Sequence, residues 1–199
     1  MKPYGVPAAP PLAAKSISKL ADSLLMRHAP RTLQGNGAFD VLSYVEFHLL
    51  KEHETDCRVT DQLPPGTWAE TRLSLMILSE GTYLEAADDQ AFARFTIAHE
   101  IGHVVLHRDL MMKHFQSSQQ GTQCPLFSRG ELEPYCDPEW QANEFAAALL
   151  MPQAGMISLR QRISNREVFI GVVVETFKVS YTAASYRVDK LVRRGKLSF

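Results

Sequence analysis

Cysteine is scarce in this sequence of 199 residues, and its three copies form no C-x-x-C pair. Cys57, Cys124 and Cys136 are odd in number, and no basic segment followed by an apolar one opens the chain, so a secreted domain held by disulfides is not expected. The sequence instead predicts a cytoplasmic protein. Cys124 and Cys136 flank a long segment between two predicted helices, where we expect idle thiols rather than a redox latch or a second metal site.

The sequence also lacks long apolar runs and a large net charge. The strongest apolar stretch, around residues 145–151, is far shorter than the roughly 20 residues of a membrane-spanning helix, so no membrane role is expected. A formal net charge of −1 argues against a chain held along its whole length on nucleic acid. The charge is uneven, because residues 1–159 hold 12 basic and 19 acidic residues, whereas residues 160–199 hold 9 and 3. The C-terminal fifth is therefore the basic part of the chain.

Apolar side chains recur at helical spacing in several segments. Before the first of them, residues 1–15 contain four prolines and little apolar surface, which predicts a flexible arm. Helices are expected from Ser16, after a cap at Asp40, over residues 90–107, and from a cap at Asp137 to Met151.

Two further segments show no helical period. Residues 73–77 alternate leucine or isoleucine with other side chains, which predicts a half-buried strand. At a sheet edge this strand could bind an extended substrate by strand addition, and proline at Ser74 would then weaken cleavage. Residues 117–137 carry glycine and proline and predict a long loop. Together the segments predict an α+β protein, mainly helical, with a small antiparallel or mixed sheet.

The predicted helix over 90–107 carries the sequence HEIGH, an H-E-x-x-H pattern, at residues 99–103. Residues four apart lie one turn above each other on one face, so His99 and His103 can converge on one metal ion, with Glu100 beside it as a general base. The alternative is a pair of helix histidines satisfied by hydrogen bonds. Two histidines and a carboxylate without a partner would be costly on so apolar a helix, which favours the metal site.

Spacing alone leaves several candidates for the third ligand. His107 repeats the spacing, but it lies about 12 Å from His99 along a continuous helix, so we expect it to support the site rather than to bind the ion. His114 stays open as an alternative. Glu139 and Asn143 share a face of the next predicted helix, so Glu139 can ligate while Asn143 accepts a hydrogen bond from a ligand histidine.

Glu139 has an alternative role, and other carboxylates compete with it as the third ligand. Glu139 also suits the positive end of a helix dipole without binding any metal. Spacing does not eliminate the rival carboxylates Glu131, Glu133, Asp137 and Glu144.

Two blocks of sequence carry a family resemblance. RFTIAHEIGHVVLH at residues 94–107 and EWQANEFAAALLMP at 139–152 occur together and in order, and they resemble the ImmA/IrrE family of metallopeptidases. The resemblance is strong over residues 70–152. It implies a zincin-like metallopeptidase domain over residues 16–159, followed by a basic helical appendage over 160–199. The segment 108–137 between the two blocks is longer than the family leads us to expect.

The resemblance also implies a function. Members of the family include cytoplasmic proteases that cleave a helix-turn-helix repressor, often in mobile elements or stress-response operons. By position, it makes His99, His103 and Glu139 the ligands of one Zn²⁺ and Glu100 the base, and it places Asn143 behind a ligand histidine. Zinc held in this way lowers the pKa of a bound water and polarises a peptide carbonyl, while Glu100 moves the proton.

Three further expectations come from outside the two blocks. Tyr83 and Tyr135 are candidates to stabilise the oxyanion, although ordinary packing is the expected role for each. Residues 172–196 resemble a helix-turn-helix, but we expect a packed appendage rather than DNA binding. The alternative function is a non-catalytic regulator or toxin–antitoxin component that binds a repressor or DNA. Glu100 argues against it, because a purely structural metal site needs no base.

Overall fold

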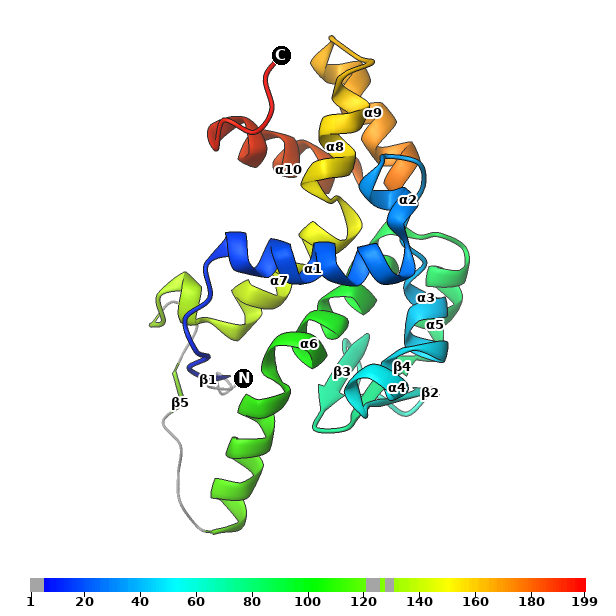
Figure 1. Cartoon of the computed structure of the whole chain (residues 1–199). Helices are drawn as coiled ribbons and strands as arrows, with labels where there is room; N and C mark the ends of the chain where they lie inside the picture. The colour runs from blue at the N-terminus through cyan, green and yellow to red at the C-terminus, as the bar shows by residue number, and fades with distance from the viewer. Residues whose placement is uncertain (1–5, 121–125, 128–130) are drawn as a thin grey trace.

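The structure is a computed structural model that describes residues 6–120, 126–127 and 131–199. It is a mainly helical α+β fold with a small mixed sheet, as the sequence predicts (Figure 1). The helices are α1 (Ala14–His28), α2 (Pro30–Leu33), α3 (Val41–Phe47), α4 (Leu49–His53), α5 (Glu80–Ala87), α6 (Ala91–Gln119), α7 (Pro138–Leu150), α8 (Gln153–Arg160), α9 (Arg166–Phe177) and α10 (Tyr181–Arg193), with a 3-10 turn, η1 (Pro134–Cys136). The strands are β1 (Val6–Pro7), β2 (Asp56–Thr60), β3 (Ala69–Arg72), β4 (Leu75–Ser79) and β5 (Leu126–Phe127).

The three-stranded sheet has the order β2-β4-β3, with β4 parallel to β2 and antiparallel to β3. The strand predicted over residues 73–77 forms as β4, two residues later, but it is not half-buried, and the edge position considered for substrate binding is ruled out because β4 is the central strand. Its residues Met76, Ile77 and Leu78 are all buried, so both faces of this strand are covered. Leu73 has a positive φ of 28° in the turn before the strand, and Ser74 also precedes it. The edges of the sheet are β2 and β3.

The helix that carries the HEIGH sequence is longer than predicted. α6 runs to Gln119, so it takes up twelve residues of the segment expected to connect the two motif blocks. Residues 108–119 contain neither glycine nor proline, and Gly121 is the next helix-breaking residue in the chain. Figure 1 shows α6 crossing the molecule with the sheet on one side and α7 on the other.

The N-terminal segment, expected as a flexible arm, is held against the start of α7 from residue 6 onward. β1 pairs with β5, and the backbone nitrogens of Ala9 and Leu12 donate to the carbonyls of Cys136 and Tyr135 at 2.9 and 2.8 Å. Ala9 is buried. The prolines that argue against a helix here therefore suit an extended segment that follows the surface of the protein.

One apolar core joins the helices of both expected domains. Ile17 and Leu25 of α1 belong to the same buried cluster as Phe169 and Phe177 of α9. No single helix in the described part of the chain is long and apolar enough to cross a membrane. The pair Arg166–Phe177 and Tyr181–Arg193, bent by 118°, meets that test of length and composition only when taken together.

Helix α10 contacts α7 and the residue after it through two basic side chains. Arg187 on α10 is buried and donates from Nε to the carbonyl of Met151 at 3.2 Å. Lys190 forms an ion pair with the buried Glu144 of α7. These two cations, in the segment that resembles a helix-turn-helix, therefore form contacts within the protein. Arg193, Arg194 and Lys196 are exposed.

Candidate metal centre

His99 and His103 lie one turn apart on α6, and their imidazoles converge. The two Nε2 atoms are 3.0 Å apart, and the ring centroids are 4.7 Å apart. Two nitrogens bound to one tetrahedral zinc ion are separated by about 3.3 Å. The helix backbone therefore brings both rings to the spacing that one ion requires.

Glu139 reaches the two histidines from the first turn of α7. That helix begins where the sequence predicts, because the side chain of Asp137 accepts a hydrogen bond from the Glu139 backbone nitrogen at 2.9 Å and Pro138 follows the cap. The carboxylate oxygens of Glu139 lie 3.5 Å from His99 Nε2 and 3.4 Å from His103 Nε2. One potential ligand atom from each of the three residues lies within 4.8 Å of the others. The donor set and its spacing both fit zinc.

Gln141 of α7 holds the ring of His103 indirectly, through His107. His103 Nδ1 lies 3.0 Å from His107 Nδ1, and His107 Nε2 lies 2.9 Å from Gln141 Oε1. The Gln141 amide nitrogen donates to the carbonyls of Pro10 and Tyr135 at 2.9 and 2.7 Å.

The orientation of the Gln141 amide sets the direction of the hydrogen bonds from His103 to Gln141. Because the amide nitrogen of Gln141 faces two carbonyls, its oxygen faces His107 and must accept from His107 Nε2–H. His107 Nδ1 is then an acceptor, and His103 Nδ1–H is its donor. The remaining nitrogen of His103, Nε2, therefore faces Glu139 and His99, and it would supply the lone pair to a bound metal.

Asn143 orients the other histidine, as the sequence predicts. Its side-chain oxygen Oδ1 lies 3.0 Å from His99 Nδ1. An Nδ1–H donated to this oxygen leaves Nε2 facing the cluster, where it would bind a metal once its own proton is lost. Both histidines are thus held by α7. Asn143 contacts His99 directly, and Gln141 contacts His103 through His107.

Glu100 lies beside the cluster without joining it. Its side chain is 8% exposed, and its Oε2 accepts a hydrogen bond of 2.6 Å from Thr71 Oγ1 of β3. Thr71 and Gln141 both touch the site, and sequence reasoning missed them. Thr71 is 29 residues from Glu100, so no local spacing connects the two. Gln141 lies two residues after Glu139, a spacing that does not put two side chains on one face of a helix, so no signal in the sequence pointed to it either.

The charges in the cluster support one another. Hydrogen bonds from His103 and His99 hold the pKa of Glu139 far below its usual range, against the effect of burial. Burial lowers the pKa of His99, but the hydrogen bond to Glu139 and the charges of Glu100 and Glu139 outweigh it and raise the pKa. For His107, burial and the neighbouring His103 lower the pKa to about 4, so this ring is neutral at pH 7, as the hydrogen bonds require.

The structure separates Glu139 from its rivals. Asp137 caps α7, Glu144 pairs with Lys190, and in the described part of the chain Glu139 is the carboxylate grouped with the two histidines. Glu131 and Glu133 lie ahead of η1 and are not in that group. The alternative ligand His114 lies about 16 Å beyond His103 along α6, too far to share an ion.

The last candidates are the two tyrosines considered for stabilising the oxyanion and the two cysteines that flank the long segment. Tyr83 donates from its hydroxyl to Glu46 of α3 at 2.6 Å and is engaged there. Tyr135 lies in η1 and is half exposed, and its carbonyl accepts from Gln141. Cys136 is a free thiol, and Cys124 lies outside the described residues. The expectation that these two cysteines are idle thiols, rather than a redox latch or a second metal site, stays a prediction.

A cavity of about 660 Å³ lies between α6, α7 and α10 and reaches the cluster only at Asn143. Phe92, Phe95 and Trp140 line it, together with Asn143, whose side chain contacts His99. Its lining is mostly apolar, so it suits a large apolar side chain.

Helix α6 with its two histidines, Glu139 on the following helix and the small mixed sheet together define a metallopeptidase type of fold. The sequence matches the family described as the IrrE N-terminal-like domain, Peptidase M78, over residues 59–189. The chain belongs to this family, and the resemblance identified from the two motif blocks is confirmed. The matched range contains β3, α6 and α7, and thus every side chain of the cluster.

Among solved structures, a Mycobacterium tuberculosis transcriptional regulator is similar in fold, with a TM-score of 0.55 and 15% sequence identity. The similarity covers 88% of this chain and 46% of that one, so the chain spans about half the length of the regulator. At this identity the likeness shows the fold. Among curated proteins, no match to the sequence is found.

Proposed function

We propose that the protein is a zinc-dependent endopeptidase. The observation that carries the proposal is the convergence of His99, His103 and Glu139 on one point, with Glu100 held beside it. These three residues would hold one Zn²⁺. When bound, zinc supplies an open coordination position, a water of lowered pKa and polarisation of the scissile carbonyl.

Glu100 is the general base in this proposal. It accepts the proton of the attacking water and passes it to the nitrogen of the leaving amine, so that the peptide C–N bond breaks while a carboxylic acid and an amine form. The hydroxyl of Thr71 donates to one carboxylate oxygen, Oε2, which leaves Oε1 to take up the proton. Thr71 therefore orients the base rather than reacting itself.

The substrate is proposed to bind as an extended strand along β3. β3 pairs with β4 on one side, and in the described residues no strand pairs with its other side. Thr71 of β3 contacts Glu100, so a peptide added to this edge passes close to the base. The apolar cavity beside Asn143 would then accept a large apolar side chain of the substrate.

As the natural substrate we propose a helix-turn-helix repressor or a similar regulatory protein in the cytoplasm. Membership of the family supports a protein substrate with a regulatory role, and the similar solved structure is itself a transcriptional regulator. The engagement of Arg187 and Lys190 within the protein favours a packed appendage over DNA binding by residues 172–196.

The test is incubation of the zinc-loaded protein with the purified repressor-like product of any neighbouring gene, followed by mass spectrometry of the fragments. We expect one specific cleavage by the wild type and by Glu85→Gln, an exposed carboxylate on α5, and none by Glu100→Gln. A stable complex with the repressor that is never cleaved would overturn the proposal and favour the non-catalytic regulator.

A further inference from the structure

A second cluster of potential metal ligands lies where α1 ends beside the junction of α3 and α4. It consists of His28, His48 and Glu52, and one potential ligand atom from each residue lies within 4.8 Å of the others. We propose that these residues form a second binding site for a divalent transition-metal cation, separate from the centre on α6 and α7.

The backbone places two of the donors on one face. Glu52 N donates to the carbonyl of His48 at 2.9 Å, so the two residues lie one helical turn apart, as His99 and His103 do on α6. His28 comes from the last turn of α1. The rings of His28 and His48 have centroids 4.3 Å apart, and His28 Nε2 lies 2.5 Å from Glu52 Oε1. Two imidazoles and one carboxylate are the donor set of the first centre.

His28 Nε2 is buried and faces the Glu52 carboxylate. It lies 2.5 Å from Glu52 Oε1 as an ion pair, without the geometry of a hydrogen bond. Imidazole and carboxylate atoms that converge in this way are the ones that a divalent cation binds. A cation between the imidazoles and the carboxylate would bind this nitrogen and the Oε1 oxygen together.

The neighbouring groups leave the three donors available. The hydroxyl of Tyr44 is taken up by His53 Nε2 at 3.0 Å, and Arg27 bonds the other oxygen of Glu52, Oε2, at 3.0 Å. Arg27 is 53% exposed, so solvent screens its charge. Its contact fixes the carboxylate and leaves Oε1 toward His28.

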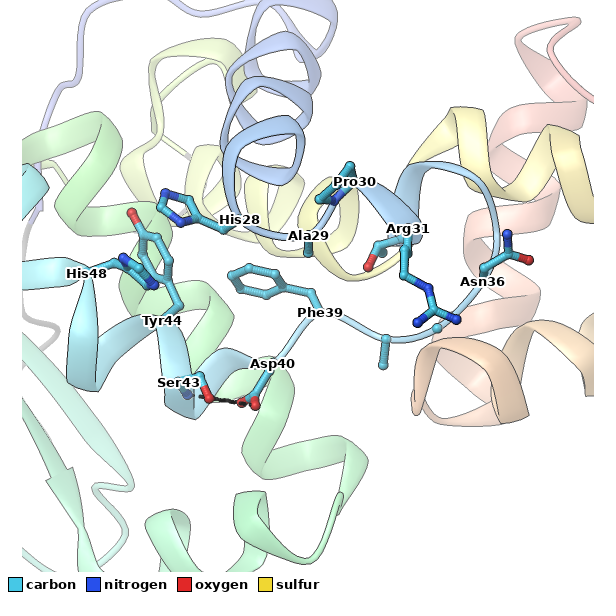
Figure 2. Close-up of a pocket in the computed structure, with 13 residues that line it drawn as sticks. His28, Ala29, Pro30, Arg31, Asn36, Phe39, Asp40, Ser43, Tyr44 and His48 are labelled. Atoms are coloured by element: carbon cyan, nitrogen blue, oxygen red, sulfur yellow. Dashed lines mark hydrogen bonds between the residues drawn. The ribbon is translucent and has the colours of Figure 1, made fainter.

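The site also has an entrance. His28, Tyr44 and His48 lie at one end of a pocket of about 460 Å³, with Arg31 and Asn36 at its other end (Figure 2). Imidazole and carboxylate donors suit Zn²⁺ and the neighbouring late first-row cations. Because the donors come from α1 and from the α3–α4 junction, an ion here would fasten the N-terminal helices to each other.

The test is a count of zinc atoms per chain. The full chain is stripped with a chelator, dialysed against buffered zinc and measured by atomic emission. We expect two zinc ions in the wild type, one in His48→Ala, one in the double variant His99→Ala/His103→Ala, and none when all three substitutions are combined. Glu54→Gln is the matched control, because it removes a neighbouring exposed charge that pairs with Arg108, and it should keep two.

One zinc ion in the wild type, or an unchanged count in His48→Ala, would overturn the proposal. Glu52→Gln is the second variant, in case His48→Ala does not fold, and far-UV circular dichroism verifies each fold. In the double variant His99→Ala/His103→Ala, zinc should still raise the melting temperature, and adding Glu52→Gln should abolish the rise. These results do not depend on peptidase activity, so they stand apart from the proposed function.

Discussion

Gln141 controls the metal centre through His107, without contacting either ligand histidine. Replacing it with leucine removes the acceptor of His107 Nε2–H and leaves that buried nitrogen unpaired. His103 then loses the contact that keeps its Nε2 lone pair directed at the ion. We expect Gln141→Leu to weaken zinc binding about 10- to 100-fold, measured by competition with a chromophoric chelator. Gln62→Leu, an exposed position, should leave the affinity unchanged, and equal affinities in the two variants would contradict the assignment.

His99 should titrate above the ordinary histidine range in the metal-free protein. The interactions with Glu139 and Glu100 favour the protonated ring more than burial disfavours it. A protonated ring cannot bind zinc, so the affinity should fall as the pH drops through this raised pKa. Because its pKa is raised in the folded state, protonated His99 stabilises the metal-free fold through Glu139 at pH values below the ordinary histidine pKa. This stabilisation is lost as the pH rises through the pKa of His99 in the folded state.

An NMR titration of the metal-free protein measures this pKa directly. In Glu139→Gln the main interaction that raises the pKa is lost, so the His99 pKa should move downward. A His99 pKa that is below 6.5 in the wild type, or that does not change in the variant, would show that Glu139 does not face this ring.

At the scale of elements, the approach of α7 to α6 depends on Gly102. A Cβ atom at this position would lie 3.1 Å from both the Cα and the carbonyl oxygen of Ala142. Alanine normally stabilises a helix by about 1 kcal/mol relative to glycine. Here we expect Gly102→Ala to push α7 away, to lower the free energy of unfolding and to weaken zinc binding, because Glu139 moves with that helix.

Gly171 in α9 is the matched control, because no atom would lie within 4 Å of a Cβ there. Gly171→Ala should raise the free energy of unfolding by about 0.5–1 kcal/mol and leave zinc binding unchanged. Chemical denaturation measures the first quantity. If Gly102→Ala behaved like Gly171→Ala, the helices would not be in close contact at this point.

Local signals explain why some elements could be predicted. Asp40 and Asp137 each accept a hydrogen bond from a backbone nitrogen at the start of a helix, so the predicted caps are confirmed. The spacing of His99, Glu100 and His103 fixed their positions on α6 in advance. The strand over residues 73–77 was predicted, but its burial was misjudged, because an alternating pattern does not distinguish a half-buried strand from a central strand that is buried on both faces.

Contacts between distant segments could not be predicted. Thr71 meets Glu100 across 29 residues, and Pro10 meets Gln141 across 131 residues. No period or motif links such pairs, because the fold alone brings them together. The second histidine cluster likewise joins α1 to the α3–α4 junction, and only the spacing of His48 and Glu52 left a trace of it in the sequence.

For the whole molecule, the C-terminal helices should be required for folding. Phe169, Ile170 and Phe177 are fully buried in the core that α1 and α6 share, and Arg187 bonds the end of α7. Ending the chain at residue 159 would expose this apolar surface. We expect the shortened chain to lack a cooperative thermal transition in calorimetry. A shortened chain that melts cooperatively and binds zinc would establish residues 160–199 as a separable appendage.

The central claim is that one centre both binds the metal and performs hydrolysis with Glu100 as its base. The most direct measurement determines the zinc content and the peptide hydrolysis of Glu100→Gln beside the wild type, with each protein stripped and reloaded in parallel. Because Glu100 contacts Thr71 and is not among the grouped ligands, the account predicts an unchanged zinc content and a loss of hydrolysis of at least about 100-fold. Hydrolysis at the wild-type rate by a fully loaded Glu100→Gln protein would contradict it.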